Sequence, residues 1–210
     1  MAFGSSGADR STDRAISFQN KDLLNKPLDV SYFVNNICNL KCRHCYVGYE
    51  EGKGELSILE WTNVFDRLID MGALTFGNVG KEPLLASEKT LSLLNYFAQK
   101  RKENHKLRFG FVTNGTLLKG KAVSEIAKIS PDYIDVSLDG TIKEHDYIRG
   151  KGNYAKTLNN LRKLPSDLKQ KIFISYTLMN HNKDSFENMI EEIKDMGIRK
   201  FCICLAHNSS

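Results

Sequence analysis

The sequence has no apolar run that approaches the length of a membrane-spanning helix, so a transmembrane segment is not expected. Residues 1–17 also lack the hydrophobic centre of a secretory signal peptide. The five cysteines are an odd number, and three of them lie close together, which is not the pattern of a disulfide framework. These absences predict a cytoplasmic protein in a reducing compartment, without a membrane partner.

A strong charge of one sign is missing as well. The net charge is +5, from 30 lysines and arginines against 25 aspartates and glutamates. The basic clusters, such as residues 100–106 and 163–171, fall where expected helices meet loops, as solvated helix ends do. Because a nucleic-acid surface usually shows a dense basic stripe with interleaved aromatic residues, binding of nucleic acid is not expected.

The chain of 210 residues fits one domain of ordinary size. We expect a flexible N-terminal arm over residues 1–27 and a core domain over residues 28–210. Apolar, β-branched runs of strand length alternate with segments of helical period. The expected strands are 30–34, 73–79, 107–112, 133–138, 172–178 and 200–205, and the expected helices are 57–72, 87–103, 119–129, 153–164 and 184–196. This order predicts parallel strands with ligands at their carboxyl ends, in either a partial barrel or a doubly wound sheet.

The most informative motif holds three cysteines, Cys38, Cys42 and Cys45, directly after the first expected strand. Close thiolates favour a metal or iron–sulfur site, and three ligands leave one position open, as in a reactive site. One alternative is structural zinc, with Cys202 and Cys204 completing the coordination. These last two cysteines alternate along the sixth expected strand and face the same way, so our first interpretation of them is core packing.

The spacing Cys-x3-Cys-x2-Cys, with His44 before the last cysteine and Tyr46 after it, resembles the signature of the radical S-adenosylmethionine (SAM) enzymes. The resemblance implies that the three thiolates hold a 4Fe-4S cluster and that SAM chelates the fourth iron. It also implies the α/β fold of the family, a partial (β/α)6 barrel of parallel strands. The style of the motifs is similar to SPASM/MoaA-like members.

Further motifs at the expected strand ends are similar to those of the family. Residues 80–83 resemble its Gly-Gly-Glu-Pro motif, with Lys81 in place of the second glycine, which predicts weaker SAM binding or an altered loop. The resemblance implies that Gly80 and Glu82 help to seat the SAM amino group and that His44 and Tyr46 pack near the cluster or adenine. The other residues that it implies in SAM binding are Asn114, Ser137, Asp139, Arg149, Thr177 and Asn180.

Each of these motifs also has an ordinary structural interpretation. Asp139 and Gly140 form a common surface-turn pair, and Arg149 could lie on a surface loop. Thr177 and Asn180 could cap the helix that is expected from residue 184. The sequence alone leaves these alternatives open.

The resemblance implies an enzyme that reductively cleaves SAM to a 5′-deoxyadenosyl radical, which abstracts hydrogen from an unknown substrate, either a peptide or a small molecule. The electron would come from an external donor such as flavodoxin or ferredoxin. No side chain need act as a general base in the first step, so no catalytic residue is named. The alternative is a non-catalytic iron–sulfur or zinc-binding module, a degenerate or partner-dependent core. Many relatives continue into a C-terminal domain, so the chain would be a minimal form or a truncated piece.

Overall fold

The computed structural model describes residues 27–47 and 54–206, so nearly all of the predicted N-terminal arm lies outside the described residues. Six parallel strands form one sheet in the order β1-β2-β3-β4-β5-β6. Because neighbours in the sheet are also neighbours in the chain, the strand order has no reversal of the kind that defines a doubly wound sheet. The prediction of a partial barrel is therefore confirmed. The strands are β1 (Asp29–Tyr32), β2 (Thr75–Asn78), β3 (Arg108–Thr113), β4 (Tyr133–Ser137), β5 (Ile172–Leu178) and β6 (Lys200–Leu205).

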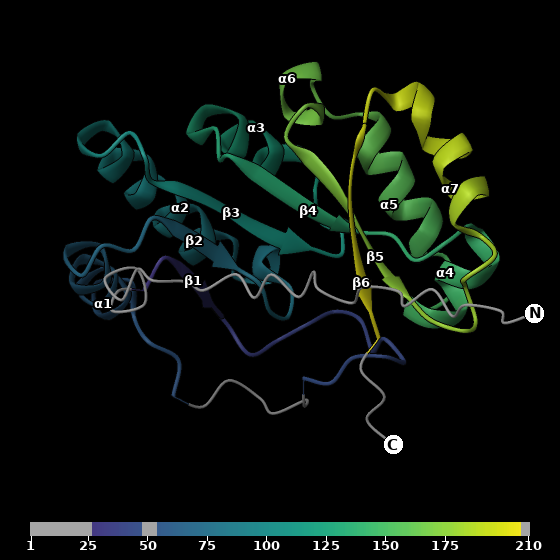
Figure 1. The fold of residues 1–210 in the computed structure, drawn as a ribbon, viewed down its shortest axis with the longest axis horizontal. Helices are drawn as coiled ribbons and strands as arrows, with labels where there is room; N and C mark the ends of the chain where they lie inside the picture. The colour runs from purple at the N-terminus through teal and green to yellow at the C-terminus, as the bar shows by residue number, and fades with distance from the viewer. Residues whose placement is uncertain (1–26, 48–53, 207–210) are drawn as a thin grey trace, which may run out of the picture.

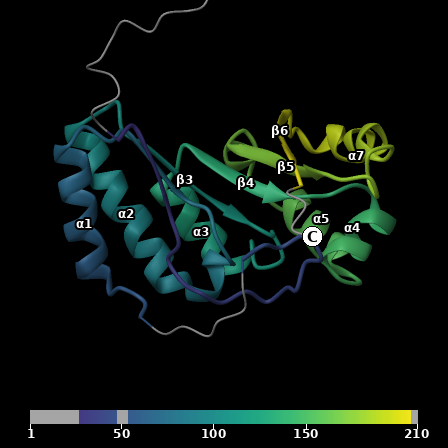
Figure 2. The ribbon, with the colours of Figure 1, turned by 60° about the horizontal axis from the view of Figure 1, so that its bottom comes forward.

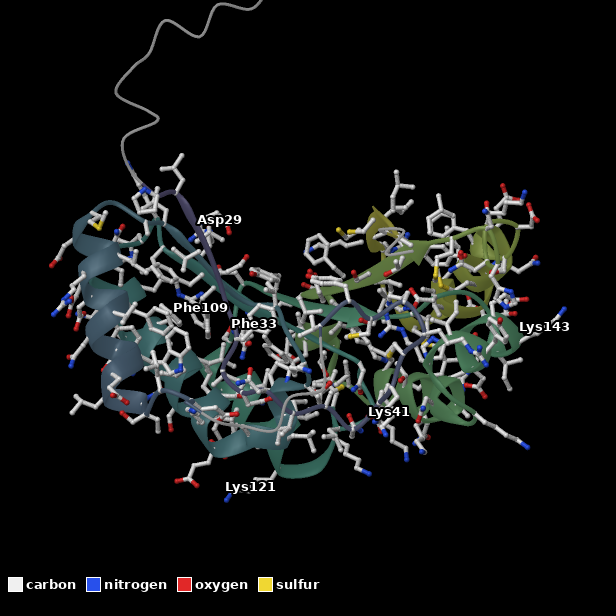
Figure 3. The ribbon with its side chains drawn as sticks, turned by 90° about the horizontal axis from the view of Figure 1, so that it is seen from below. Asp29, Phe33, Lys41, Phe109, Lys121 and Lys143 are labelled. Carbon is white, nitrogen blue, oxygen red and sulfur yellow. The ribbon has the colours of Figure 1, made fainter. Side chains whose placement is uncertain are left out.

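The helices lie together on one side of the curved sheet (Figures 1 and 2). Seen from below, the sheet forms an arc with the helices on its outer side and an open inner side (Figure 3). The helical elements are α1 (Ile58–Asp70), η2 (Pro83–Ala86), α2 (Ser87–Glu103), α3 (Gly120–Ile129), α4 (Ile142–Arg149), α5 (Asn153–Arg162), α6 (Ser166–Lys169), α7 (Phe186–Ile193) and η3 (Lys194–Met196). A capping box begins α1, since Ser57 Oγ accepts from Glu60 N at 3.2 Å and Glu60 Oε2 accepts from Ser57 N at 2.8 Å.

The outer face of the sheet carries the hydrophobic core. Alternate strand residues on this face are apolar and buried, and they pack against the helices. Phe97 of α2 packs closely against Phe76 of β2 and Phe65 of α1, with tilted rings whose centroids are 4.7 Å and 4.8 Å apart. Burial of these rings supplies the main driving force for holding helix and sheet together.

The inner face is lined by small and polar residues instead. Tyr133 of β4 lies across its neighbours: a Cβ at Gly110 would come within 2.6 Å of the Tyr133 ring, and one at Gly77 within 2.6 Å of its hydroxyl. Only glycine leaves room for this ring on β2 and β3. The inner face therefore stays shallow and leaves an open volume inside the arc.

Some elements differ from the predictions. Helices α4 and α6 were not predicted, and the segment expected as one helix over residues 184–196 is divided into α7 and η3. The core-packing interpretation of Cys202 and Cys204 was wrong, because both side chains are exposed. Their strand, β6, is at the edge of the sheet and pairs with β5 alone among the described strands. An edge strand keeps part of its surface open, which its sequence does not reveal.

Candidate functional site

A cavity of about 680 Å³ lies at the carboxyl ends of the strands, inside the arc. The three predicted metal-ligating thiols line it, together with His44 and Tyr46. The other predicted residues that line it are Gly80, Asn114, Ser137, Arg149 and Thr177. Residues from five different strand ends and from the cysteine loop thus meet around one volume, as ligand sites in open α/β sheets do.

Several hydrogen bonds hold the cysteine loop against the strand ends, and three of them illustrate how. Glu82 N donates to Ile37 O at 3.1 Å, next to the first cysteine. Asn114 Nδ2 donates to Asn39 Oδ1 at 2.8 Å. Arg43 N donates to Ile148 O at 2.9 Å, at the end of α4. The loop has no regular secondary structure, so these bonds set the position of its thiols.

Burial raises the pKa of the Cys42 thiol, the Arg149 guanidinium opposes this, and the thiols of Cys38 and Cys45 add to the rise. Burial likewise raises the pKa of Cys38. The three thiols thus affect one another electrostatically and line the same cavity. Among the described residues, no group of three His, Cys, Asp or Glu side chains is arranged around a single ion.

Glu82 is fully buried and does not line the cavity. Its carboxylate accepts hydrogen bonds from Asn114 N at 2.9 Å, Leu84 N at 3.0 Å and Thr113 Oγ1 at 2.9 Å. Burial raises the pKa of Glu82, and these bonds oppose the rise. The Glu82 side chain thus joins the ends of β2 and β3, and the residues of its segment that line the cavity are Val79, Gly80 and Lys81.

Arg149 is the residue that links the strand ends to the cysteine loop. Its Nε donates to Asp139 Oδ2 at 2.6 Å, and its Nη1 approaches Cys42 Sγ at 3.9 Å. Asp139 is fully buried, and its second oxygen accepts from Thr177 N at 2.8 Å. Burial lowers the pKa of Arg149, but the Asp139 carboxylate more than offsets this, so the guanidinium stays charged. Arg149 therefore lies on a helix and in the cavity wall, not on a surface loop.

Two histidines lie around this ion pair. His145 is buried and accepts from Asp139 N through Nδ1 at 3.2 Å, which fixes the turn after β4. Burial lowers the pKa of His145 to about 4, so the ring is neutral. His44 in the cysteine loop has a buried Nδ1 that finds no partner among the described residues. An unpartnered ring nitrogen beside the thiols fits a site that takes a further polar group.

Lys81 confirms the expectation that its position suits glycine. Its backbone has φ 57°, in the left-handed region that L-residues rarely adopt. The loop thus keeps a path that glycine would follow without strain, and it carries a lysine there. Gly80 before it is required for another reason, because a Cβ at Gly80 would overlap the Phe33 ring at 1.7 Å.

The end of β5 differs in part from the prediction. Thr177 lines the cavity, but Asn180 is exposed and does not. Asn182, two residues further on, is buried and donates through Nδ2 to Thr177 O at 2.9 Å. The sequence analysis also did not identify Asn39, Arg43 or His145 as residues that shape the site. Asn39 and Arg43 contact residues that are 75 or more positions away in the sequence. No local sequence pattern encodes such contacts.

A family model described as the radical SAM superfamily matches residues 32–193. Because this is more than half of the chain, the chain belongs to the radical SAM superfamily. Membership confirms the expected cofactors at the level of the family, a 4Fe-4S cluster and SAM. The residues present fit this pair, since free thiols, an unpartnered ring nitrogen and polar strand ends surround one cavity.

The sequence is 30% identical over 179 residues to the antilisterial bacteriocin subtilosin biosynthesis protein AlbA of Bacillus subtilis (strain 168), covering 83% of this chain and 38% of the relative. It is 28% identical over 168 residues to the Fe-coproporphyrin III synthase of Methanosarcina barkeri (strain Fusaro / DSM 804), covering 79% of this chain and 40% of the relative. The chain thus spans about 40% of the length of these curated relatives.

Among solved structures, Streptococcus suis SuiB bound to S-adenosylmethionine matches with a TM-score of 0.75 and 17% identity, covering 89% of this chain and 42% of SuiB. At this level of identity the match establishes the fold, a half-barrel of parallel strands. In the described part of the chain, no helix is long and apolar enough to cross a membrane.

Proposed function

We propose that this chain is the core of a radical SAM enzyme in which Cys38, Cys42 and Cys45 hold a 4Fe-4S cluster and the adjoining cavity holds SAM. The observation that carries the proposal is that these thiols and the polar strand ends line one cavity. When bound, the two cofactors supply a 5′-deoxyadenosyl radical by reductive cleavage of SAM, and this radical abstracts hydrogen from the substrate.

The polar groups around the cavity have separate tasks in this proposal. Arg149 offers a planar cation for the SAM carboxylate, and the buried Asp139 positions it. Ser137, Thr177 and Asn114 offer hydrogen bonds to the carboxylate or ribose. The backbone of Gly80 receives the amino group, and His44 and Tyr46 flank the cluster. The arc of the sheet restricts water around the reacting carbon.

The substrate that we propose is a peptide. One relative is named for the biosynthesis of a bacteriocin, and one SuiB structure, with a TM-score of 0.74, is described as bound to the precursor peptide SuiA. The one-electron donor is of the flavodoxin or ferredoxin class. Both partners are proposals for the whole protein, since the relatives are longer than this chain.

The test is 5′-deoxyadenosine formation by anaerobically reconstituted protein with SAM and a strong reductant. We expect product from the wild type and none from Cys42→Ala, together with a lower iron content in the variant. The electron paramagnetic resonance spectrum of the reduced cluster is expected to change when SAM is added. Normal loading with iron and sulfide but no cleavage would instead favour the alternative of a non-catalytic cluster-binding module.

A further inference from the structure

Cys202 and Cys204 form a pair of free thiols that has no role in the site described above. They alternate along β6 and face the inner side of the arc, and their Sγ atoms are 3.9 Å apart. The separation is about twice the length of a disulfide bond, so no bond joins the two sulfur atoms in this structure. Both side chains are exposed, and Cys204 lines the cavity, so a molecule in the cavity can reach the Cys204 thiol.

The pair lies beside the proposed SAM site. Cys204 lines the same cavity as Cys38, Cys42 and Cys45, in the part that β6 and Ala206 contribute. In the sheet, Cys204 is paired with Thr177, which is one of the proposed SAM contacts, and Cys202 is paired with Ser175. A radical formed at the cavity centre would therefore be generated in a chamber that has a thiol in its wall.

The surroundings keep Cys202 protonated. Burial raises the pKa of the Cys202 thiol, and the Cys204 thiol and the Asp135 carboxylate raise it further. Across the sheet, Cys202 pairs with Ser175 of β5, which in turn pairs with Ser137 of β4. The charged groups of the adjacent row are Asp135 and Lys200, and the Lys200 ammonium donates to Gln170 O at 2.7 Å. Cys202 is thus a second, protonated thiol 3.9 Å from the Sγ atom of Cys204.

We propose that Cys204, paired with Cys202, donates a hydrogen atom to a carbon radical in the cavity. This inference rests on the proposed function. In the step, the S–H bond of Cys204 breaks homolytically, a C–H bond forms on the radical carbon, and a thiyl radical remains on Cys204. Cys202 then loses its proton to solvent and shares the unpaired electron in a two-sulfur radical anion. One electron from the flavodoxin- or ferredoxin-class donor and two protons from solvent restore both thiols.

The test needs no substrate. When SAM is cleaved without one, the 5′-deoxyadenosine formed must take a hydrogen from a group in the cavity. In D2O the thiols carry deuterium, while the O–D bond of water is too strong to supply it. We therefore expect deuterium in 5′-deoxyadenosine from the wild-type protein, measured by mass spectrometry with dithionite and no thiol reductant. The deuterated fraction is expected to fall several-fold in Cys204→Ser.

The matched control is Ile203→Ala, which changes an exposed residue of the same strand on its opposite face. Its deuterated fraction is expected to equal that of the wild type. An equal fraction in Cys204→Ser, with 5′-deoxyadenosine still formed, would overturn the role of the pair and leave the proposed function intact. A lower iron content in Cys202→Ser or Cys204→Ser would also overturn it, because the thiols would then be metal ligands. Absence of 5′-deoxyadenosine in every variant would overturn the proposed function and this role with it.

A second measurement uses no cofactor. Trivalent arsenicals bind two thiols that lie close together, so phenylarsine oxide should bind once to a Cys38→Ala/Cys42→Ala/Cys45→Ala variant whose fold is confirmed by circular dichroism. Adding Cys204→Ser should abolish this binding. If the triple variant binds no arsenical, Cys202 and Cys204 do not act as a pair and the proposal fails.

Discussion

The two faces of the sheet divide stability and chemistry between them. On the outer face, Phe76, Phe109 and Ile134 are fully buried under helices. On the inner face, the same strands present Gly77, Gly110 and Asp135, which leave space. Because strand side chains alternate between faces, one segment of sequence serves both purposes at once. This difference shows that the apolar positions of a strand identify the face that the helices cover. The positions between them identify the face that carries the site.

The two faces meet at the strand ends, where buried polar groups replace apolar ones. Glu82 joins β2 to β3 there, and Asp139 joins β4 to β5 while it positions Arg149. These carboxylates satisfy their hydrogen bonds inside the protein, as buried polar groups must. They therefore hold the cavity wall in place without facing the cavity. The carboxyl ends of the strands thus belong to both the core and the site.

The largest expected effect comes from breaking the outer face. Phe65→Ala removes a fully buried ring that contacts Tyr32, Trp61, Phe76 and Phe97, so it should lower the free energy of unfolding by about 3–5 kcal/mol. The inner-face control Ser175→Ala should change it by less than about 0.5 kcal/mol. Urea denaturation followed by circular dichroism measures both. Equal losses in the two variants would show that the faces do not differ as we describe.

The sequence predicted the outer face well. Every expected strand is present, with ends within about two residues, because β-branched apolar runs between turn signals are strong local patterns. Helix α4 was missed because it is polar, with few apolar residues besides Ile142 and Ile148 to show a period. Because no helix was predicted over residues 142–149, Arg149 could also be interpreted as a residue of a surface loop.

The site was predicted in its residue types but not in its connections. The resemblance identified half of the residues that line the cavity, including the three thiols, Ser137 and Thr177. It could not show that Asp139 faces Arg149 and not the cavity, because their ion pair depends on how α4 returns to the strand ends. The exposure of Cys202 and Cys204 was also beyond the sequence, since it depends on which elements cover an edge strand.

A smaller effect should come from a charge on the inner face. Burial raises the pKa of Asp135 to about 6 from its ordinary 3.8. The folded state then holds this proton more tightly than the unfolded state, so stability is lost as the pH rises from about 4 to about 6. Asp135→Asn removes that loss. It should raise the free energy of unfolding at pH 7 by about 1–2 kcal/mol, after allowance for partial solvent screening.

The check is to measure the free energy of unfolding of variant and wild type across pH and to subtract one from the other. His145, whose lowered pKa affects the pH dependence in the opposite direction, contributes equally to both proteins and cancels in this difference. This difference should be close to zero at pH 3.5, because both forms are then uncharged at position 135, and it should reach its full value above pH 6. A constant difference over the whole range would mean that the Asp135 carboxyl is not destabilised by its place on the inner face.

The smallest expected effect concerns Lys81, in the loop after β2, whose backbone is strained by its positive φ of 57°. A left-handed residue other than glycine costs about 1–2 kcal/mol, and glycine costs about 0.4–1 kcal/mol through the flexibility of the unfolded chain. Lys81→Gly should therefore stabilise the protein by about 0.5–1 kcal/mol in guanidinium denaturation. Lys183→Gly is the matched control, since Lys183 is exposed and is not among the residues with positive φ, and it should destabilise. If both variants destabilise equally, contacts of the Lys81 side chain outweigh its backbone strain, and its place in the glycine position would then be a stabilising feature of the cavity wall.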